Sequence, residues 1–280
     1  MRLSPRPSRL VLALTILFVL VSTAYALAQF GGGGRRRAVG VGSGLAPRQF
    51  PDGDVAICRL VYNEGRRFAG GWQTDYPLGE RNLSVRLSDL TRTRVSRARD
   101  GSPNHYLVRI NDDQLFSCPF LMAGDVGSAT FSEAEATRLR EYLLKGGFLW
   151  TDDMWGEEEW EVWSAELAKV LPPKEFPIEE VTPADGIFST QFVVKEMPQI
   201  PNLPYWRSSG GDTSEQGAES AVPHFHVVRD HQGRVMVAMT RNTDIADAFE
   251  READDPEYFS RFSPNGYALG INVVLYALTH

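Results

Sequence analysis

The chain has 280 residues and a formal net charge of −7, and 42% of its residues are hydrophobic. An acidic chain offers no basic surface to a phosphate backbone, so we exclude nucleic acid as a partner. About 230 residues follow the non-globular start, which is enough for one domain with a full core. The two cysteines are too few for a disulfide framework.

Residues 1–28 have the parts of an export signal. Arginines precede an apolar run over 10–21, and Ala26-Leu-Ala28 places small residues where a signal peptidase cleaves. We therefore expect a periplasmic or secreted protein. The alternative is an uncleaved anchor, formed by residues 10–28, that holds the protein in the membrane.

The rest of the chain divides into a linker and one domain. Residues 29–53 are rich in glycine and arginine and cannot bury a core. Residues 54–280 should form an α/β domain. Within it, residues 181–230 are rich in Pro, Gly and Ser, and we expect an irregular insertion over the edge of the site.

Apolar runs alternate with amphipathic segments along the domain. The expected strands are 54–62, 105–110, 114–122, 148–151 and 234–240. The expected helices are 80–91, 132–144, 157–170, 242–250 and 264–277. Ser132 and Glu135 form a capping box, and Pro119 marks the end of the third strand or a bulge in it. This alternation predicts a three-layer α/β fold with a mostly parallel sheet and helices on both faces.

Cys58 and Cys118 each lie in an apolar run that should be a buried strand. Free cysteine packs as a small hydrophobe, so we expect two free thiols in the core. A single bridge is the alternative in an oxidising compartment. Two cysteines alone do not make a metal site.

Asp152 and Asp153 follow the strand 148–151, where ligands bind in an open parallel sheet. Adjacent residues on an extended chain point in opposite directions. One carboxylate should face a crevice as a ligand contact or a general base. The other should cap the helix that starts near Glu157, since a helix N-terminus favours an anion.

Further polar and aromatic residues fall at predicted strand ends or loops. We predict that these residues line a ligand crevice together: Arg59, Trp72, Asp75, Tyr76, Asp152, Asp153, Asn242 and Asp244. Trp72 and Tyr76 are suited to stacking on a sugar or peptide. Arg59 needs a partner carboxylate, either in the site or in a structural ion pair. Asp75, Asn242 and Asp244 have helix capping as the alternative role.

Two patterns are suited to a metal ion. His224 and His226 would point to one side of a strand, but no third ligand is apparent, and surface histidines are the alternative. Asp244, Asp247 and Glu250 supply hard oxygen ligands, but their spacing is not that of an EF-hand loop. We therefore assign no metal ligand and no cofactor.

Several segments of residues 54–280 together resemble a bacterial family of unknown function, DUF4159. The resembling segments are Arg59-Leu-Val-Tyr62, Trp72-Gln-Thr-Asp-Tyr-Pro77, Asn82-Leu83, Asp113-Gln-Leu-Phe116, Pro119-Phe-Leu-Met122, Phe131-Ser-Glu to Leu143, Gly146-Gly-Phe-Leu-Trp-Thr-Asp-Asp153, Asn242-Thr-Asp-Ile-Ala-Asp-Ala-Phe-Glu250, and Gly270-Ile-Asn272 to His280.

This resemblance implies a flavodoxin-like fold similar to class I glutamine amidotransferases. Those enzymes carry a cysteine at the elbow after the corresponding strand, whereas this chain has Asp152-Asp-Met154. The resemblance therefore argues against amidotransfer. It implies a role in the cell envelope, with no reaction attached.

The leading hypothesis is a non-catalytic binding or assembly module of the cell envelope, with a glycan or peptide ligand. The alternative is a hydrolase that uses Asp152 or Asp153 as general base, with or without a divalent cation. A third hypothesis is a scaffold for a membrane or envelope protein. The first two require that Asp75, Asp152 and Asp244 converge.

Overall fold

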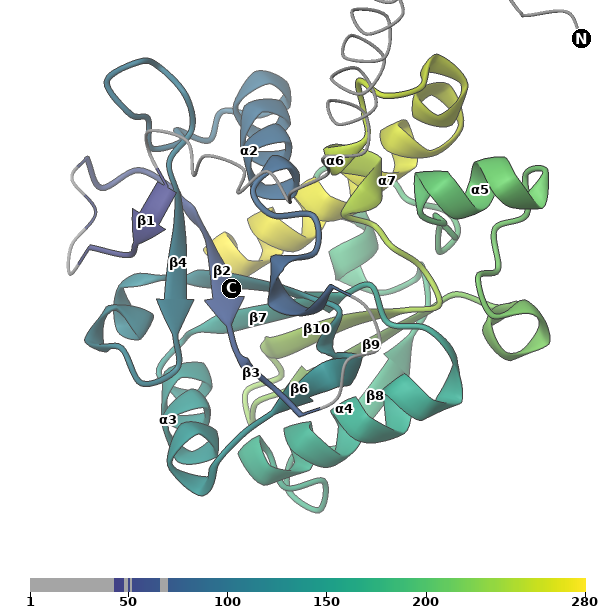
Figure 1. Cartoon of the computed structure of the whole chain (residues 1–280). Coiled ribbons are helices and arrows are strands. Elements are labelled where there is room, and N and C mark those ends of the chain that lie inside the picture. Colours follow the sequence, from purple (N-terminus) through teal and green to yellow (C-terminus); the bar gives the residue numbers. More distant parts are fainter. Residues whose placement is uncertain (1–42, 48–49, 51, 66–69) are drawn as a thin grey trace, which may run out of the picture. The chain divides into compact units, whose positions relative to one another are not determined.

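Five runs predicted as strands join three further strands in one eight-stranded sheet, the middle layer of the domain (Figure 1). The structure, a computed structural model, describes residues 43–47, 50, 52–65 and 70–280, all within the unit Val41–His280. The predicted export signal and most of the 29–53 linker lie outside the described residues. In sheet order the strands are β1 (Ser43–Leu45), β4 (His105–Arg109), β2 (Ile57–Val61), β5 (Phe120–Gly124), β7 (Phe148–Asp152), β10 (Val235–Arg241), β9 (His224–Arg229) and β8 (Ile178–Val181).

The sheet is mostly parallel, as predicted. The strands from β1 to β10 in that order are parallel to their neighbours. Strand β9 pairs antiparallel with both β10 and β8, so the sheet has one antiparallel edge. A separate two-stranded sheet pairs β3 (Asn63–Glu64) with β6 (Ala129–Thr130).

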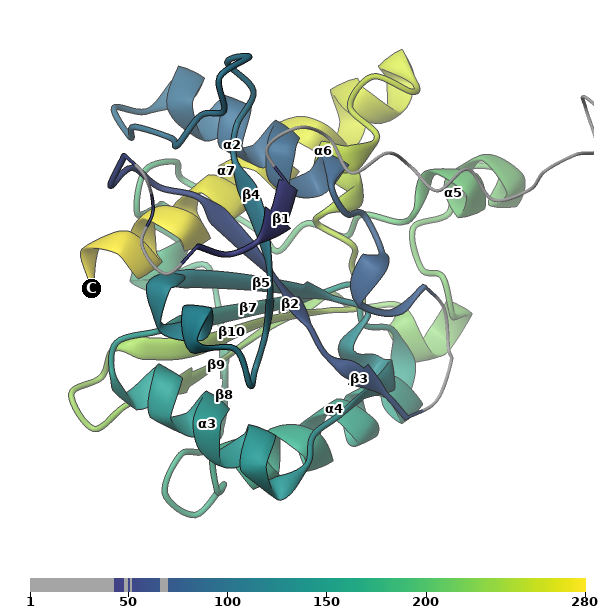
Figure 2. The same ribbon diagram turned by 60° about the vertical axis from the view of Figure 1, so that its left-hand side comes forward.

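Helices cover both faces of the sheet, which confirms the three-layer α/β fold (Figures 1 and 2). One face carries α2 (Leu78–Leu90), α6 (Asp247–Glu250) and α7 (Pro256–Thr279), and the other carries α3 (Glu133–Leu144) and α4 (Gly156–Val170). Helix α5 (Leu203–Ser209) packs on α7, with the Trp206 and Tyr258 rings 5.7 Å apart. The 3₁₀ helices are η1 (Gly71–Gln73), η2 (Asp113–Ser117), η3 (Val126–Ser128), η4 (Gly186–Ser189) and η5 (Gly217–Ser220).

No helix in the described part of the chain is long and apolar enough to cross a bilayer.

Two hydrophobic cores result, because alternate residues of each strand point to opposite faces. On β7, Leu149 faces the core formed with α3 and α4. Its neighbours Phe148 and Trp150 face the core formed with α2 and α7. Trp150 is fully buried, and burial of such a side chain contributes roughly 1.5–3 kcal/mol to stability.

The connection from α3 to β7 forms as the sequence predicts. Ser132 and Glu135 make the capping box that starts α3. Gly146 adopts a φ of 106° after the helix. A Cβ on Gly147 would lie 2.4 Å from the Tyr142 ring, whose hydroxyl donates to the carbonyls of Cys118 and Phe148. Only glycine lets strand β7 begin this close to the helix.

Some expected boundaries are wrong. The strand expected over 114–122 begins at Phe120, because Pro119 lacks the N–H that a ladder needs and residues before it form η2. The last helix starts at Pro256 instead of 264, with Asp255 accepting hydrogen bonds from Glu257 and Tyr258. Proline fits the first helical turn, and Pro264 is tolerated inside α7.

The expectation of two free core thiols is also wrong, because Cys58 and Cys118 form a disulfide. Strands β2 and β5 are neighbours, with Cys58 in register with Leu121. The turn of η2 then brings Cys118 to a Cα–Cα distance of 6.1 Å from Cys58, which a bridge can span.

Residues 181–230 were expected to form an irregular insertion, but they contain regular secondary structure. Strand β9 lies within this range and pairs with two strands of the main sheet. Its Phe225 and Val227 are buried in a core. His226 on the same strand is only 8% exposed, so the interpretation as a surface histidine is wrong for this residue.

Candidate functional site

The carboxyl ends of neighbouring parallel strands carry polar residues with a left-handed backbone. Asp125 follows β5, Asp153 follows β7 and Asn242 follows β10, with φ angles of 52°, 57° and 58°. Asp75, after η1, has a φ of 63°. Positive φ is uncommon outside glycine and costs of order 1–3 kcal/mol, and such residues cluster at functional sites. This edge of the sheet is therefore the natural place to look for one.

Three carboxylates from separate loops meet at this edge. Asp75, Asp153 and Asp244 each offer an oxygen atom, and these atoms lie within 4.8 Å of one another. Asp75 and Asp244 are 7% and 2% exposed, whereas Asp153 is only partly buried. We call these three residues the acidic cluster. The predicted convergence of distant acidic segments is present, with Asp153 in the place expected for Asp152.

Asp75 has an unused carboxylate oxygen. Its Oδ2 is buried and accepts no hydrogen bond from any residue that the structure describes. Burial raises the pKa of Asp75 well above its usual range, and the charges of Asp247 and Asp153 raise it further. Arg59 opposes this shift. A buried carboxylate oxygen without a donor is a position where a cation would be stabilised.

The pKa values of Asp153 and Asp244 are also raised by burial and by nearby negative charges. Burial raises the pKa of Asp153, as do the nearby charges of Asp125 and Glu215. Burial also raises the pKa of Asp244, with Asp75 and Asp153 adding to the effect. The Trp155 indole N–H donates to Asp153 at 2.9 Å, and the Asp247 backbone N–H donates to Asp244 at 2.9 Å. These bonds fix the carboxylates without neutralising them.

Asp152 has a different role from the one expected. It is fully buried, and its Oδ2 accepts the Ala246 backbone N–H at 2.7 Å while Oδ1 accepts the Thr240 hydroxyl. Burial raises its pKa to about 6. Asp152 therefore holds the loop that carries Asp244 in place.

Neither aspartate caps α4, so that expectation is wrong. The Glu159 carboxylate accepts the Trp155 backbone N–H at 2.7 Å. The Asn242 side-chain oxygen accepts the Gly156 backbone N–H at 3.0 Å. Asn242 also donates to the carbonyl of Val222, so it ties the β10 loop to the start of α4.

Arg59 makes a structural ion pair and also lies near the acidic cluster. It pairs with Glu80, and both side chains are fully buried. Its two terminal nitrogens are buried without a partner among the described residues. A Cβ on Gly124 would lie 2.9 Å from Arg59 Nη1 and 3.9 Å from Asp75 Oδ2. Glycine at this position therefore leaves the guanidinium and the Asp75 carboxylate facing the same space.

The two aromatic residues lie beside the Asp75 loop. Trp72 is partly buried against the core, and its ring centroid is 6.4 Å from that of Tyr76. The Tyr76 hydroxyl forms a 2.9 Å hydrogen bond with His105 of β4, and the two rings pack edge to face. Stacking of Trp72 and Tyr76 on a ligand stays a prediction.

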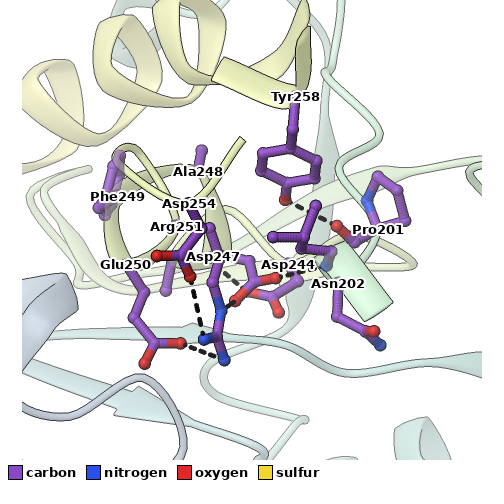
Figure 3. Close-up of polar contacts among 12 residues, drawn as sticks. Pro201, Asn202, Asp244, Asp247, Ala248, Phe249, Glu250, Arg251, Asp254 and Tyr258 are labelled. Carbon is purple, nitrogen blue, oxygen red and sulfur yellow. Dashed lines mark hydrogen bonds and ion pairs between the residues drawn. The ribbon is translucent and has the colours of Figure 1, made fainter. Parts of the chain in front are cut away.

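Sequence reasoning did not place Asp247 and Glu250 beside Asp75. Asp75, Asp247 and Glu250 also place oxygens within 4.8 Å of one another. Figure 3 shows Arg251 reaching both Asp247 and Glu250, with Asp247 Oδ1 at 3.3 Å and Glu250 Oε2 at 2.8 Å. Arg251 therefore balances this side of the site. Asp247 and Glu250 were recognised as hard ligands, but their meeting with Asp75 depends on contacts between distant segments.

Carboxylate oxygens from separate loops, close together and mostly buried, are the donors that Mg²⁺ and Ca²⁺ prefer. The same oxygens accept hydrogen bonds from hydroxyl and amino groups. Asp153 is the only partly exposed residue of the acidic cluster.

Comparison with family models identifies a family. The model of a family described as "Domain of unknown function (DUF4159)" matches residues 56–278. A search of curated proteins found no match to the sequence.

Proposed function

We propose that this chain, which belongs to the DUF4159 family, is a ligand-binding module of the cell envelope that works through a divalent cation. The cation binds between Asp75, Asp153 and Asp244. The observation that carries the proposal is the convergence of three carboxylate oxygens within 4.8 Å, one of them on an aspartate with a buried oxygen that has no hydrogen-bond donor among the described residues.

Electrostatic repulsion among the three carboxylates favours the site with a bound cation over the site without one. Two like charges 4.8 Å apart repel by about 3–4 kcal/mol at an effective dielectric constant of 20. Burial raises the pKa values of all three groups, and the charges of neighbouring carboxylates raise them further, so protonation relieves the repulsion at low pH. A divalent cation relieves it at neutral pH and turns each repulsion into an attraction to the ion.

The ligand we propose is a glycan or a peptide. Mg²⁺ and Ca²⁺ take six or more oxygen ligands, so three carboxylates leave positions for oxygens of another molecule. Asp153 is the partly exposed residue of the acidic cluster. Trp72 and Tyr76, beside the Asp75 loop, add aromatic surface for the same ligand.

We propose that the protein is exported, periplasmic or secreted, with residues 1–28 cleaved or residues 10–28 kept as an anchor. The disulfide between Cys58 and Cys118 supports this location, because such bonds persist in oxidising compartments and are rare in the cytosol. A membrane or envelope protein is the partner that this location favours.

We further propose that the likeness to class I glutamine amidotransferases extends to the location of the site. Asp153 has a φ of 57° directly after β7, which supports a sharp strand-to-loop turn like the elbow of those enzymes. An aspartate at this turn supplies a ligand oxygen or a base, whereas a cysteine would supply a thiolate.

A hydrolase is the second candidate, because buried carboxylates with raised pKa values are suited to general base catalysis near neutral pH. Asp152 uses both oxygens in hydrogen bonds within the fold. Asp153 is therefore the better candidate for the base. Hydrolysis of a glycan or peptide that requires the cation and is lost in Asp153→Asn would favour this candidate over pure binding.

Calorimetric titration of the metal-free mature protein with Mg²⁺, Ca²⁺ and Mn²⁺ tests the proposal. We expect saturable binding of one ion, and at least tenfold weaker binding in Asp75→Asn and Asp244→Asn. Asp89→Asn, an exposed position on α2, is the matched control and should bind as the wild type does. Equal binding by all variants, or no binding by a folded wild-type protein, would overturn the proposal.

A further inference from the structure

A second group of metal-ligating side chains lies on the antiparallel edge of the sheet. The sequence places His224 and His226 on one side of a strand but offers no third ligand. Strand β9 pairs antiparallel with β8, and this register sets Glu180 directly opposite His226. The fold therefore supplies a carboxylate that lies 44 residues away from His224 in the sequence.

The three side chains are close enough to share one ion. One potential ligand atom from each of Glu180, His224 and His226 lies within 4.8 Å of the other two. His224 Nδ1 and Glu180 Oε1 are hydrogen-bonded at 2.7 Å. The two imidazole rings lie 5.7 Å apart between centroids. We call these three residues the histidine cluster.

One ring nitrogen of His226 has no hydrogen-bond partner among the described residues. The residue is 8% exposed, and its Nδ1 is buried without a hydrogen-bond partner among the residues that the structure describes. Buried polar atoms are nearly always paired, so an orphaned imidazole nitrogen needs an explanation. Binding of a metal ion to this nitrogen would give it a partner.

The surroundings of His226 hold its ring in place as a ligand. Trp160 of α4 packs on it with ring centroids 4.5 Å apart. The Arg241 guanidinium lies 5.1 Å from the Trp160 ring centroid and pairs with Glu157.

We propose that Glu180, His224 and His226 form a binding site for Zn²⁺. Two imidazoles and one carboxylate are a donor set that zinc uses in proteins, and hard ions such as Mg²⁺ favour oxygen donors alone. Three protein ligands leave a fourth position free. The side chain of Glu180 is 58% exposed and that of His224 27%, so this position is open to water or to an atom of a substrate.

Zinc titration in a protein with the Asp75→Asn change tests this site without interference from the acidic cluster. We expect one Zn²⁺ to bind per chain. His224→Gln and Glu180→Gln should each weaken binding by at least about tenfold. His231→Gln is the matched control, because His231 is an exposed histidine paired with Glu175, and binding should be unchanged. Co²⁺ substitution should give the absorption of a four-coordinate ion in the protein with an intact histidine cluster.

The variants at His224 and Glu180 alter partly or largely exposed side chains, so circular dichroism should report an unchanged fold. Equal Zn²⁺ affinity in His224→Gln, Glu180→Gln and His231→Gln would overturn the proposal. Absence of zinc binding in the folded protein would also overturn it. Either result leaves the proposed function of the acidic cluster untouched, because that cluster shares no ligand with this site.

Discussion

The acidic cluster and the histidine cluster show two ways in which one sheet can hold ligand atoms together. The acidic cluster is built from loops beyond the strands, with a left-handed backbone at Asp75 and Asp153. The histidine cluster is built on paired strands, where the register of β8 and β9 places the side chains. Carboxylates that loops hold close together repel one another, so the fold needs protons or cations to offset this repulsion. We therefore expect the stability of the fold to depend on protons or cations at the acidic cluster and very little on the histidine cluster.

The largest expected effect concerns the ion pair beside the acidic cluster. Glu80→Gln leaves Arg59 as a fully buried charge without its carboxylate. We expect the free energy of unfolding to fall by about 3–5 kcal/mol, as measured by urea denaturation. Glu141→Gln, which breaks a solvent-exposed pair with Lys145, should change it by no more than about 0.5 kcal/mol. Similar small effects in both variants would show that Arg59 does not depend on Glu80.

The disulfide comes next, because it joins β2 to the segment just before β5. The double variant Cys58→Ala, Cys118→Ala should lose about 2–5 kcal/mol of unfolding free energy. The measurement compares denaturation of this variant with that of the wild type. A wild-type protein that loses no stability on reduction would mean that the bridge does not form in solution.

A third prediction separates stability from binding at the acidic cluster. Asp75→Asn removes one of three crowded charges, so the metal-free protein should gain on the order of 1–2 kcal/mol at pH 8. The gain is limited because Asp75 also balances Arg59. The same change should abolish stabilisation by Mg²⁺ or Ca²⁺ in thermal unfolding. A loss of stability without metal would indicate that Asp75 forms a structural ion pair instead.

The dependence of stability on pH follows from two buried carboxylates near the acidic cluster, Asp152 and Asp247. Burial raises the folded-state pKa to about 6 for Asp152 and about 7 for Asp247, above the usual value of 3.8. Between these values the folded state binds more protons than the unfolded state, so the unfolding free energy falls as pH rises. Metal-free protein should therefore be more stable at pH 5 than at pH 8, and saturating Ca²⁺ should reduce this difference. Stability that rises over this range would contradict the raised pKa values.

The smallest expected effect belongs to the histidine cluster. Glu180→Gln changes a side chain that is 58% exposed on an edge strand. We expect the unfolding free energy without metal to change by less than about 0.5 kcal/mol. A large loss of stability would mean that this cluster, like the acidic one, depends on its charges for the fold.

Local signals in the sequence predicted most of the fold. The capping box at Ser132 and Glu135, the Gly146-Gly147 turn and the apolar run of β7 all depend on neighbouring residues, and all three are confirmed. The β9 strand was missed because it lies in a segment rich in Pro, Gly and Ser, and its place comes from pairing with β8 and β10. The disulfide was missed because the distance between Cys58 and Cys118 depends on strand order.

The meeting of acidic residues from distant segments was predicted, but not which residues meet. The rule that ligands bind beyond the carboxyl ends of parallel strands led to the expectation that Asp75, Asp152 and Asp244 converge, whereas the structure brings Asp153 to Asp75 and Asp244. The sequence could not assign roles to Asp152 and Asp153. The left-handed turn at Asp153 decides which of the two carboxylates joins the acidic cluster. The pairing of Asp247 with Arg251 and the position of Glu180 opposite His226 also depend on contacts that no local pattern encodes.

The most direct test of the central claim is a crystal structure of the protein grown with Mn²⁺, with the ion located by anomalous scattering. Our account predicts an anomalous peak within about 2.0–2.6 Å of carboxylate oxygens of Asp75, Asp153 and Asp244. Ordered carboxylates with no peak between them, at an Mn²⁺ concentration that saturates a calorimetric titration, would contradict it.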